Sequence, residues 1–132
     1  MSEKKNILVV EDNNFVRMQI LRYLAETGAH VLEASEGGQA LEIIREHDRA
    51  GNPVSLIVAD VRMEPVDGFE FIRSIRGLEL DIPVILVTGD NNPDLLEQAG
   101  SWGVSAVMIK PVQKDRLVKT ALRIIESHNR KG

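Results

Sequence analysis

The sequence contains no cysteine, and this absence excludes several kinds of chemistry. Disulfide bonds, thiolate metal sites and cysteine nucleophiles are ruled out, and the composition gives no sign of an oxidising compartment. The polar residues 1–5 run directly into a strand-like segment, so the apolar stretch of a signal peptide is missing, and no apolar run approaches membrane-spanning length. We therefore expect a cytoplasmic protein without a membrane partner.

Blocks of basic charge are also missing. The 20 acidic and 16 basic residues are spread along the chain and give a formal net charge of −4. Nucleic acid is therefore not expected as a direct partner. The chain has 132 residues, 43% of them hydrophobic, which is enough for one domain with its own core. We predict a single domain over residues 1–132, with its core over residues 6–128.

Short apolar runs typical of buried strands alternate with segments of helical periodicity. The predicted strands cover residues 7–10, 30–34, 56–60, 83–88 and 106–110. The predicted helices cover residues 16–27, 35–46, 69–77, 93–99 and 117–125, and residues 48–53 are the most loop-like stretch. Five strand–helix units joined by right-handed crossovers predict an α/β fold, with a parallel sheet covered by helices on both faces.

The run Leu56–Asp60 delivers a single carboxylate to the end of a buried strand. Ligands of open α/β sheets bind beyond the carboxyl ends of the strands, so Asp60 is a candidate site residue. Aspartate is also a common turn residue, and Asp60 alone is explained equally well as a cap of the following turn.

Further polar side chains follow the neighbouring predicted strands and should converge with Asp60. Glu11 and Asp12 follow the first strand, Thr88 ends the fourth and Lys110 ends the fifth. Crowded carboxylates repel one another, and a proton or a bound cation resolves the repulsion. Oxygen ligands favour a hard ion such as Mg²⁺. A carboxylate surrounded by Mg²⁺, a lysine and a hydroxyl is equipped for phosphoryl transfer, with Asp60 as the attacking group.

The motifs taken together resemble the receiver domain of bacterial response regulators, and the resemblance covers essentially the whole chain. In chain order the matching residues are Glu11-Asp12, Asp60, Met63, Asp67-Gly68, Thr88-Gly89 and Lys110-Pro111. The resemblance is to single-domain, chemotaxis-regulator-like members, with no attached output module. It implies a flavodoxin-like, doubly wound five-stranded parallel sheet with the strand order 2-1-3-4-5.

The resemblance also implies a role for the matching acidic residues. Asp60 would accept a phosphoryl group from the phosphohistidine of a histidine kinase, from a phosphotransfer protein or from a small phosphodonor. Asp12, Asp60 and the main-chain carbonyl of Arg62 would hold Mg²⁺, with Glu11 beside them. The chain would then be a phosphoacceptor that assists its own phosphorylation and dephosphorylation, and not an enzyme acting on other substrates.

The resemblance further implies how the signal is used. Thr88 and Lys110 would bind the phosphoryl oxygens. Phosphorylation adds roughly two negative charges at pH 7 and would bias a two-state loop. An unknown downstream protein would dock at the face formed by the fourth helix, the last strand and the closing helix.

Two positions depart from the family pattern. Glu64 stands where the family usually has proline, and the proline is Pro65. Val107 stands where the family usually has a tyrosine or phenylalanine whose ring moves with the hydroxyl of Thr88. We therefore expect the Thr88 loop and its helix to relay phosphorylation, with a smaller rearrangement at the last strand.

The departures keep two alternatives open. One is an interaction module that keeps the fold and works without phosphorylation. The weaker one is a small Mg²⁺-dependent phosphatase. The phosphatase is disfavoured because Arg62 stands two residues after Asp60, where such an enzyme would need an acid/base carboxylate.

Overall fold

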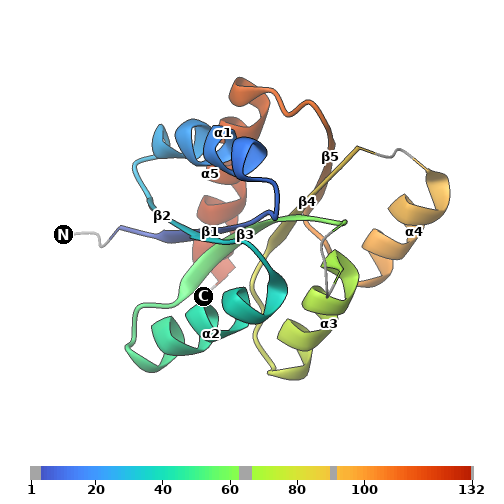
Figure 1. The fold of residues 1–132 in the computed structure, drawn as a ribbon. Coiled ribbons are helices and arrows are strands. Elements are labelled where there is room, and N and C mark those ends of the chain that lie inside the picture. Colours follow the sequence, from blue (N-terminus) through green and yellow to red (C-terminus); the bar gives the residue numbers. More distant parts are fainter. Residues whose placement is uncertain (1–3, 63–66, 90–91, 132) are drawn as a thin grey trace.

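Five parallel strands form one sheet in the order β2-β1-β3-β4-β5, and helices alternate with them along the chain (Figure 1). The computed structural model describes residues 4–62, 67–89 and 92–131, and for 128–131 the backbone alone. The strands are β1 (Asn6–Val10), β2 (His30–Ala34), β3 (Val54–Asp60), β4 (Val84–Thr88) and β5 (Ala106–Ile109). The helices are α1 (Asn14–Ala25), α2 (Gly37–Arg49), α3 (Gly68–Gly77), α4 (Pro93–Ser101) and α5 (Lys114–Lys131). The predicted fold class and strand order are confirmed.

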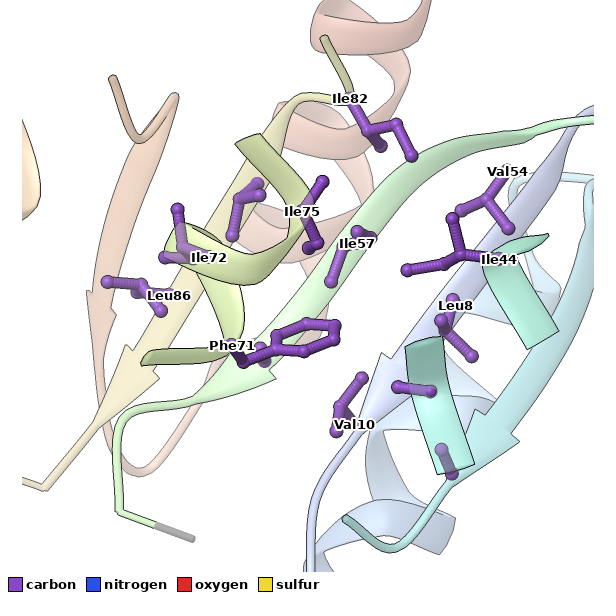
Figure 2. Close-up of a cluster of buried hydrophobic side chains, with 14 of the residues drawn as sticks. Leu8, Val10, Ile44, Val54, Ile57, Phe71, Ile72, Ile75, Ile82 and Leu86 are labelled. Atoms are coloured by element: carbon purple, nitrogen blue, oxygen red, sulfur yellow. The ribbon is translucent and has the colours of Figure 1, made fainter. Parts of the chain in front are cut away.

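The sheet separates the core into two clusters of buried side chains, one between each face of the sheet and the helices that cover it. On one face, side chains of α2 and α3, together with Ala99 of α4, pack against the strands, and Figure 2 shows Phe71 and Ile44 pointing toward them. On the other face, α1 and α5 pack against the same strands. A strand buried on both faces has a continuous apolar sequence. All five residues of β1 and of β4 are buried, which explains why these strands were clear from the sequence.

Helices α1, α2, α3 and α4 begin at residues whose side chains cap them. The side chain of Asn13 accepts a hydrogen bond from the Val16 amide at 3.0 Å. The predicted loop over residues 48–53 was too long, because α2 continues to Arg49. The chain leaves this helix only at Gly51, whose φ of +76° is a conformation that favours glycine.

The buried faces of two helices differ from the predicted ones. In α3, the helical spacing of Phe69, Ile72 and Ile75 predicts the buried face. Phe71, which this spacing leaves out, is fully buried, whereas Phe69 is only partly buried. In α5, the sequence predicts an apolar face formed by Leu117, Ala121, Leu122, Ile124 and Ile125. Leu122 is nevertheless 44% exposed, because it lies about 100° around the helix from the buried Ala121. None of the helices within the described residues has both the length and the apolar character needed to span a membrane.

Candidate functional site

The sheet brings the predicted site residues together at its carboxyl edge. β1 and β3 are paired along their length, so Glu11, which follows β1, lies beside Asp60, the last residue of β3. β4 lies on the other side of β3 and ends in Thr88, which is fully buried. The amide of Lys110 donates to the Thr88 carbonyl at 2.7 Å, which extends the β4–β5 ladder by one residue. The convergence expected from the strand order is therefore observed.

Lys110 joins the two buried carboxylates of the site. Its Nζ lies 2.9 Å from Oδ2 of Asp60 and 3.1 Å from Oε1 of Glu11. Glu11 is 1% exposed and Asp60 is 6% exposed, so both acids are almost withdrawn from water. Burial opposes the charged form of Lys110, but its hydrogen bonds to Asp60 and Glu11 outweigh this effect and raise the pKa of Lys110. One ammonium group thus compensates two buried carboxylates.

A third carboxylate completes an acidic group. Glu11, Asp12 and Asp60 each offer one carboxylate oxygen, and the three oxygens lie within 4.8 Å of one another. Burial raises the pKa of Glu11 to about 7, although a hydrogen bond from the Asn13 amide opposes the shift, and Asp12 and Asp60 contribute to the rise. Clustered oxygen donors of this kind fit a hard divalent cation, so the group is consistent with a metal site.

The backbone around Asp60 is held by the start of α3. The Gly68 amide donates to the Val61 carbonyl at 2.8 Å. A Cβ atom on Gly68 would lie 2.6 Å from the Asp60 carbonyl oxygen and 2.9 Å from the Val61 Cα, closer than real Cβ contacts occur. Glycine is therefore required here, because a larger residue would displace the end of β3.

Arg62 lies at the mouth of the site. Its amide donates to Oδ1 of Asp60 at 3.1 Å, so both oxygens of the Asp60 carboxylate are held. Asp60, Arg62, Gly89 and Lys110 line an open hollow of about 380 Å³, which gives a ligand access to the carboxylate. The departure from the family pattern at Glu64 falls within residues 63–66, which lie outside the described residues.

Three residues of α1 near this edge have an exposure or hydrogen bonds that were not predicted from the sequence. Phe15 and Met18 are 80% and 53% exposed. The available signal was that both fall outside the apolar stripe of Val16 and Ile20. Arg17 is engaged in hydrogen bonds to three acceptors, and its spacing in the sequence gave no signal for them.

The geometry at this edge agrees with a comparison of the chain with protein families. A family model described as the response regulator receiver domain matches residues 7–122. The chain belongs to this family. Receiver domains are phosphorylated by histidine kinases and are typically phosphoacceptors rather than enzymes. In this receiver domain, the pocket formed by Glu11, Asp12 and Asp60 is typical of a phosphoacceptor site.

Several relatives share the receiver domain. The chain is 33% identical to the CAI-1 autoinducer sensor kinase/phosphatase CqsS of Vibrio cholerae over 118 residues. The matched segment covers 87% of this chain and 16% of that protein. The chain likewise spans 16% of the rice two-component response regulator ORR21. It is 33% identical to the probable methanogenesis regulatory protein FilR2 of Methanothrix harundinacea, covering 91% of this chain and 81% of that protein.

Solved structures show the same fold. A response regulator receiver protein from Pseudomonas putida is 25% identical, with a TM-score of 0.79 and coverage of 93% of this chain and 99% of that one. A CheY-like receiver domain protein from Methanospirillum hungatei has a TM-score of 0.87 at 22% identity, covering 98% of this chain and 100% of that one. At that identity, the second likeness supports the fold alone.

Proposed function

We propose that residues 1–132 act as one phosphorylation-dependent signalling switch. In this proposal Asp60 accepts a phosphoryl group from a histidine kinase or a phosphotransfer protein, in a reaction that depends on Mg²⁺. The observation that carries the proposal is the setting of Asp60. Its carboxylate faces an open hollow while Lys110 holds one oxygen and the Arg62 amide holds the other.

The proposed transfer is an in-line displacement at phosphorus. A bond forms between an Asp60 carboxylate oxygen and phosphorus while the bond from phosphorus to the donor imidazole nitrogen breaks, and that nitrogen keeps the electron pair. Mg²⁺ bound by Asp12, Asp60 and the main-chain carbonyl of Arg62, with Glu11 beside them, would neutralise charge on the phosphoryl oxygens.

Two residues on the neighbouring strands would then bind the phosphoryl group. Lys110 already lies 2.9 Å from Asp60, so a short movement of its Nζ would bring it to a phosphoryl oxygen. Thr88 ends the adjacent strand and would donate its hydroxyl to another oxygen. These two contacts would link the new charge on Asp60 to β4 and β5.

The proposed output is a change in protein binding at the face of α4, β5 and α5. Leu96 and Ile109 on this face are 45% and 40% exposed, which leaves apolar surface for a partner protein. In α4, whose residues are all described, Ala99 is the one buried residue. A helix with so little buried surface can shift at low cost when the adjoining loop moves.

Intact mass spectrometry tests the phosphoacceptor. The chain is incubated with Mg²⁺ and acetyl phosphate, or with a phosphorylated kinase, and we expect one phosphoryl adduct that chelation of Mg²⁺ prevents. Asp60→Asn should abolish the adduct. Asp81→Asn is a matched control, because Asp81 is an exposed aspartate that precedes β4 at the opposite edge of the sheet, and this variant should be modified like wild type.

The same experiment decides between the proposal and its two alternatives. Val107 in place of the usual aromatic residue favours the interaction module that works without phosphorylation. The absence of an adduct with every donor would support that module. Rapid multiple turnover of a phosphoester would instead support a phosphatase.

A further inference from the structure

Arg17 of α1 joins three separate parts of the fold at the carboxyl edge of the sheet. Its Nε donates to Oε1 of Glu33 in β2 at 2.9 Å. Its Nη1 donates to the main-chain carbonyl of Glu11 at 2.8 Å, and its Nη2 to Oδ1 of Asn14 at 2.6 Å. Three guanidinium nitrogens thus have three different acceptors, and the side chain is only 13% exposed.

The contact with Glu11 holds the backbone that carries the acidic group. The Glu11 amide donates to the Ala34 carbonyl of β2 at 3.1 Å, and Arg17 binds the Glu11 carbonyl, so the peptide units on both sides of this residue are held. The Glu11 carbonyl and the Asp12 amide belong to one planar peptide unit. Fixing that carbonyl therefore fixes the peptide from which the Asp12 side chain projects.

The Glu11 side chain depends on the same backbone. Its Oε2 accepts the Asn13 amide at 3.1 Å while Oε1 accepts Nζ of Lys110. A rotation of the Glu11–Asp12 peptide would break the first bond and move both carboxylates relative to Asp60. Metal sites depend strongly on such outer hydrogen bonds to their ligand groups.

We propose that Arg17 is a positioning residue for the acidic group. It holds the Glu11–Asp12 peptide in the orientation that lets Asp12 and Asp60 bind a divalent cation, and Glu33 orients its guanidinium. The inference rests on the proposed function for its effect on phosphorylation, but its effect on cation binding is measured separately. The simpler role, an ion pair between Arg17 and the largely exposed Glu33, would stabilise the fold weakly and would leave the site unchanged.

Calorimetric titration with Mg²⁺ distinguishes these roles. Arg17→Gln should raise the Mg²⁺ dissociation constant about tenfold, the lower end of the effect of outer hydrogen-bond partners. Arg17→Lys should lie between this variant and wild type, because an ammonium cannot reach all three acceptors. Glu33→Gln should have a smaller effect, since the amide oxygen still accepts a bond. Arg22→Gln is the matched control, because Arg22 is exposed on the same helix.

The phosphorylation rate supplies a second readout that a purely structural role would not move in this way. For Arg17→Gln, the rate at low Mg²⁺ should fall by the same factor as the affinity and should recover at saturating Mg²⁺. Unchanged Mg²⁺ affinity in Arg17→Gln, or an equal loss in Glu33→Gln, would overturn the proposal.

Hydrogen exchange separates failure of this inference from failure of the proposed function. The Asn13 amide, which donates to Glu11, should exchange faster in Arg17→Gln, whereas the Ile57 amide, which donates to the Pro83 carbonyl at 3.0 Å, should not. This measurement needs neither Mg²⁺ nor a phosphoryl donor. If wild type accepts no phosphoryl group, the function is wrong but the role of Arg17 is still decided. Unchanged exchange at Asn13 would contradict that role.

Discussion

A buried polar side chain lies at each end of β1, Asn6 within the strand and Glu11 directly after it, and the two are accommodated in opposite ways. Asn6, at the amino end, is 2% exposed and donates to the carbonyls of Asn52 and Pro53 at 3.0 and 3.3 Å. Glu11, at the carboxyl end, is 1% exposed and shares one lysine with Asp60. The Asn6 side chain is neutral and donates to two carbonyls, whereas the two buried carboxylates at the carboxyl edge share one lysine.

This difference separates stabilising from functional polar groups. A buried amide with satisfied hydrogen bonds stabilises the fold and needs no ligand. Buried carboxylates that outnumber their cations destabilise the fold until a proton or a metal ion neutralises them. The carboxylates at the carboxyl edge therefore lower the stability of the cation-free fold and allow this edge to bind a cation. Substitutions that alter one edge at a time test this difference.

The largest effect is expected from the glycine that α3 places against Asp60. Gly68→Ala would put a methyl group within 3 Å of backbone atoms of Asp60 and Val61, which cannot rotate away. We expect a loss of about 3 kcal/mol in the free energy of unfolding, at the upper end of overpacking costs, and weaker Mg²⁺ binding. Urea denaturation and Mg²⁺ titration measure the two effects.

Gly77 at the other end of α3 supplies the control. A Cβ atom there would meet no atom within 4 Å. Gly77→Ala should therefore stabilise the chain by about 0.5 kcal/mol, by lowering the entropy of the unfolded state, without changing Mg²⁺ affinity. Similar stabilities of the two variants would contradict the close packing at Gly68.

The next effect is a pH dependence that originates at Glu11. Its pKa is about 7 in the folded chain and 4.5 ordinarily, so the folded state binds this proton more tightly than the unfolded state. The resulting stabilisation is complete below pH 4.5 and is lost as the pH rises through 7. Each pKa unit corresponds to about 1.36 kcal/mol, so the loss amounts to roughly 3 kcal/mol.

Urea unfolding of the cation-free protein at about pH 5 and about pH 8 measures this loss. Glu11→Gln should abolish the corresponding part of the pH dependence, and Glu42→Gln, at an exposed position of α2, should retain it. Saturating Mg²⁺ should restore stability at high pH, because the ion neutralises the ionised carboxylates. The same pH dependence in wild type and Glu11→Gln would show that a group other than Glu11 causes it.

The two edges were not equally predictable from the sequence. The convergence of Glu11, Asp60 and Lys110 followed from the rule that parallel strands end at one edge, which requires only strand positions and order. The burial of Asn6 was missed, because its acceptors lie 46 and 47 residues away in a loop whose path the sequence does not specify. Arg17 was missed for a different reason, because its acceptors lie only 3, 6 and 16 residues away and its spacing in the sequence does not single them out. Strand β2 was predicted with its observed bounds, His30–Ala34, because a strand is recognised from the local sequence of its own residues.

A smaller effect, on stability alone, is expected at the amino edge. Asn6→Leu keeps the branched shape of the side chain but removes the donor to two carbonyls, so the free energy of unfolding should fall by about 2 kcal/mol. Mg²⁺ affinity and phosphorylation should not change. Asp60→Asn should not lower the free energy of unfolding, because it removes one crowded carboxylate. It should weaken Mg²⁺ binding, because that carboxylate is a proposed metal ligand. If Asn6→Leu weakened Mg²⁺ binding, the two edges would be coupled and the comparison would be wrong.

The smallest effect concerns how phosphorylation is read within the carboxyl edge. Val107 is partly buried against the α2–α3 side of the core and has no ring to rotate, whereas α4 is attached through Ala99. With Mg²⁺ and a phosphoryl analogue such as beryllofluoride, amide shifts should be larger at Gly89 and along α4 than at Val107. The Asn6 amide, at the opposite edge, serves as the internal reference and should not shift. Large shifts at Val107 and Ile109 would mean that β5 relays the signal despite the missing aromatic ring, and that α4 follows it.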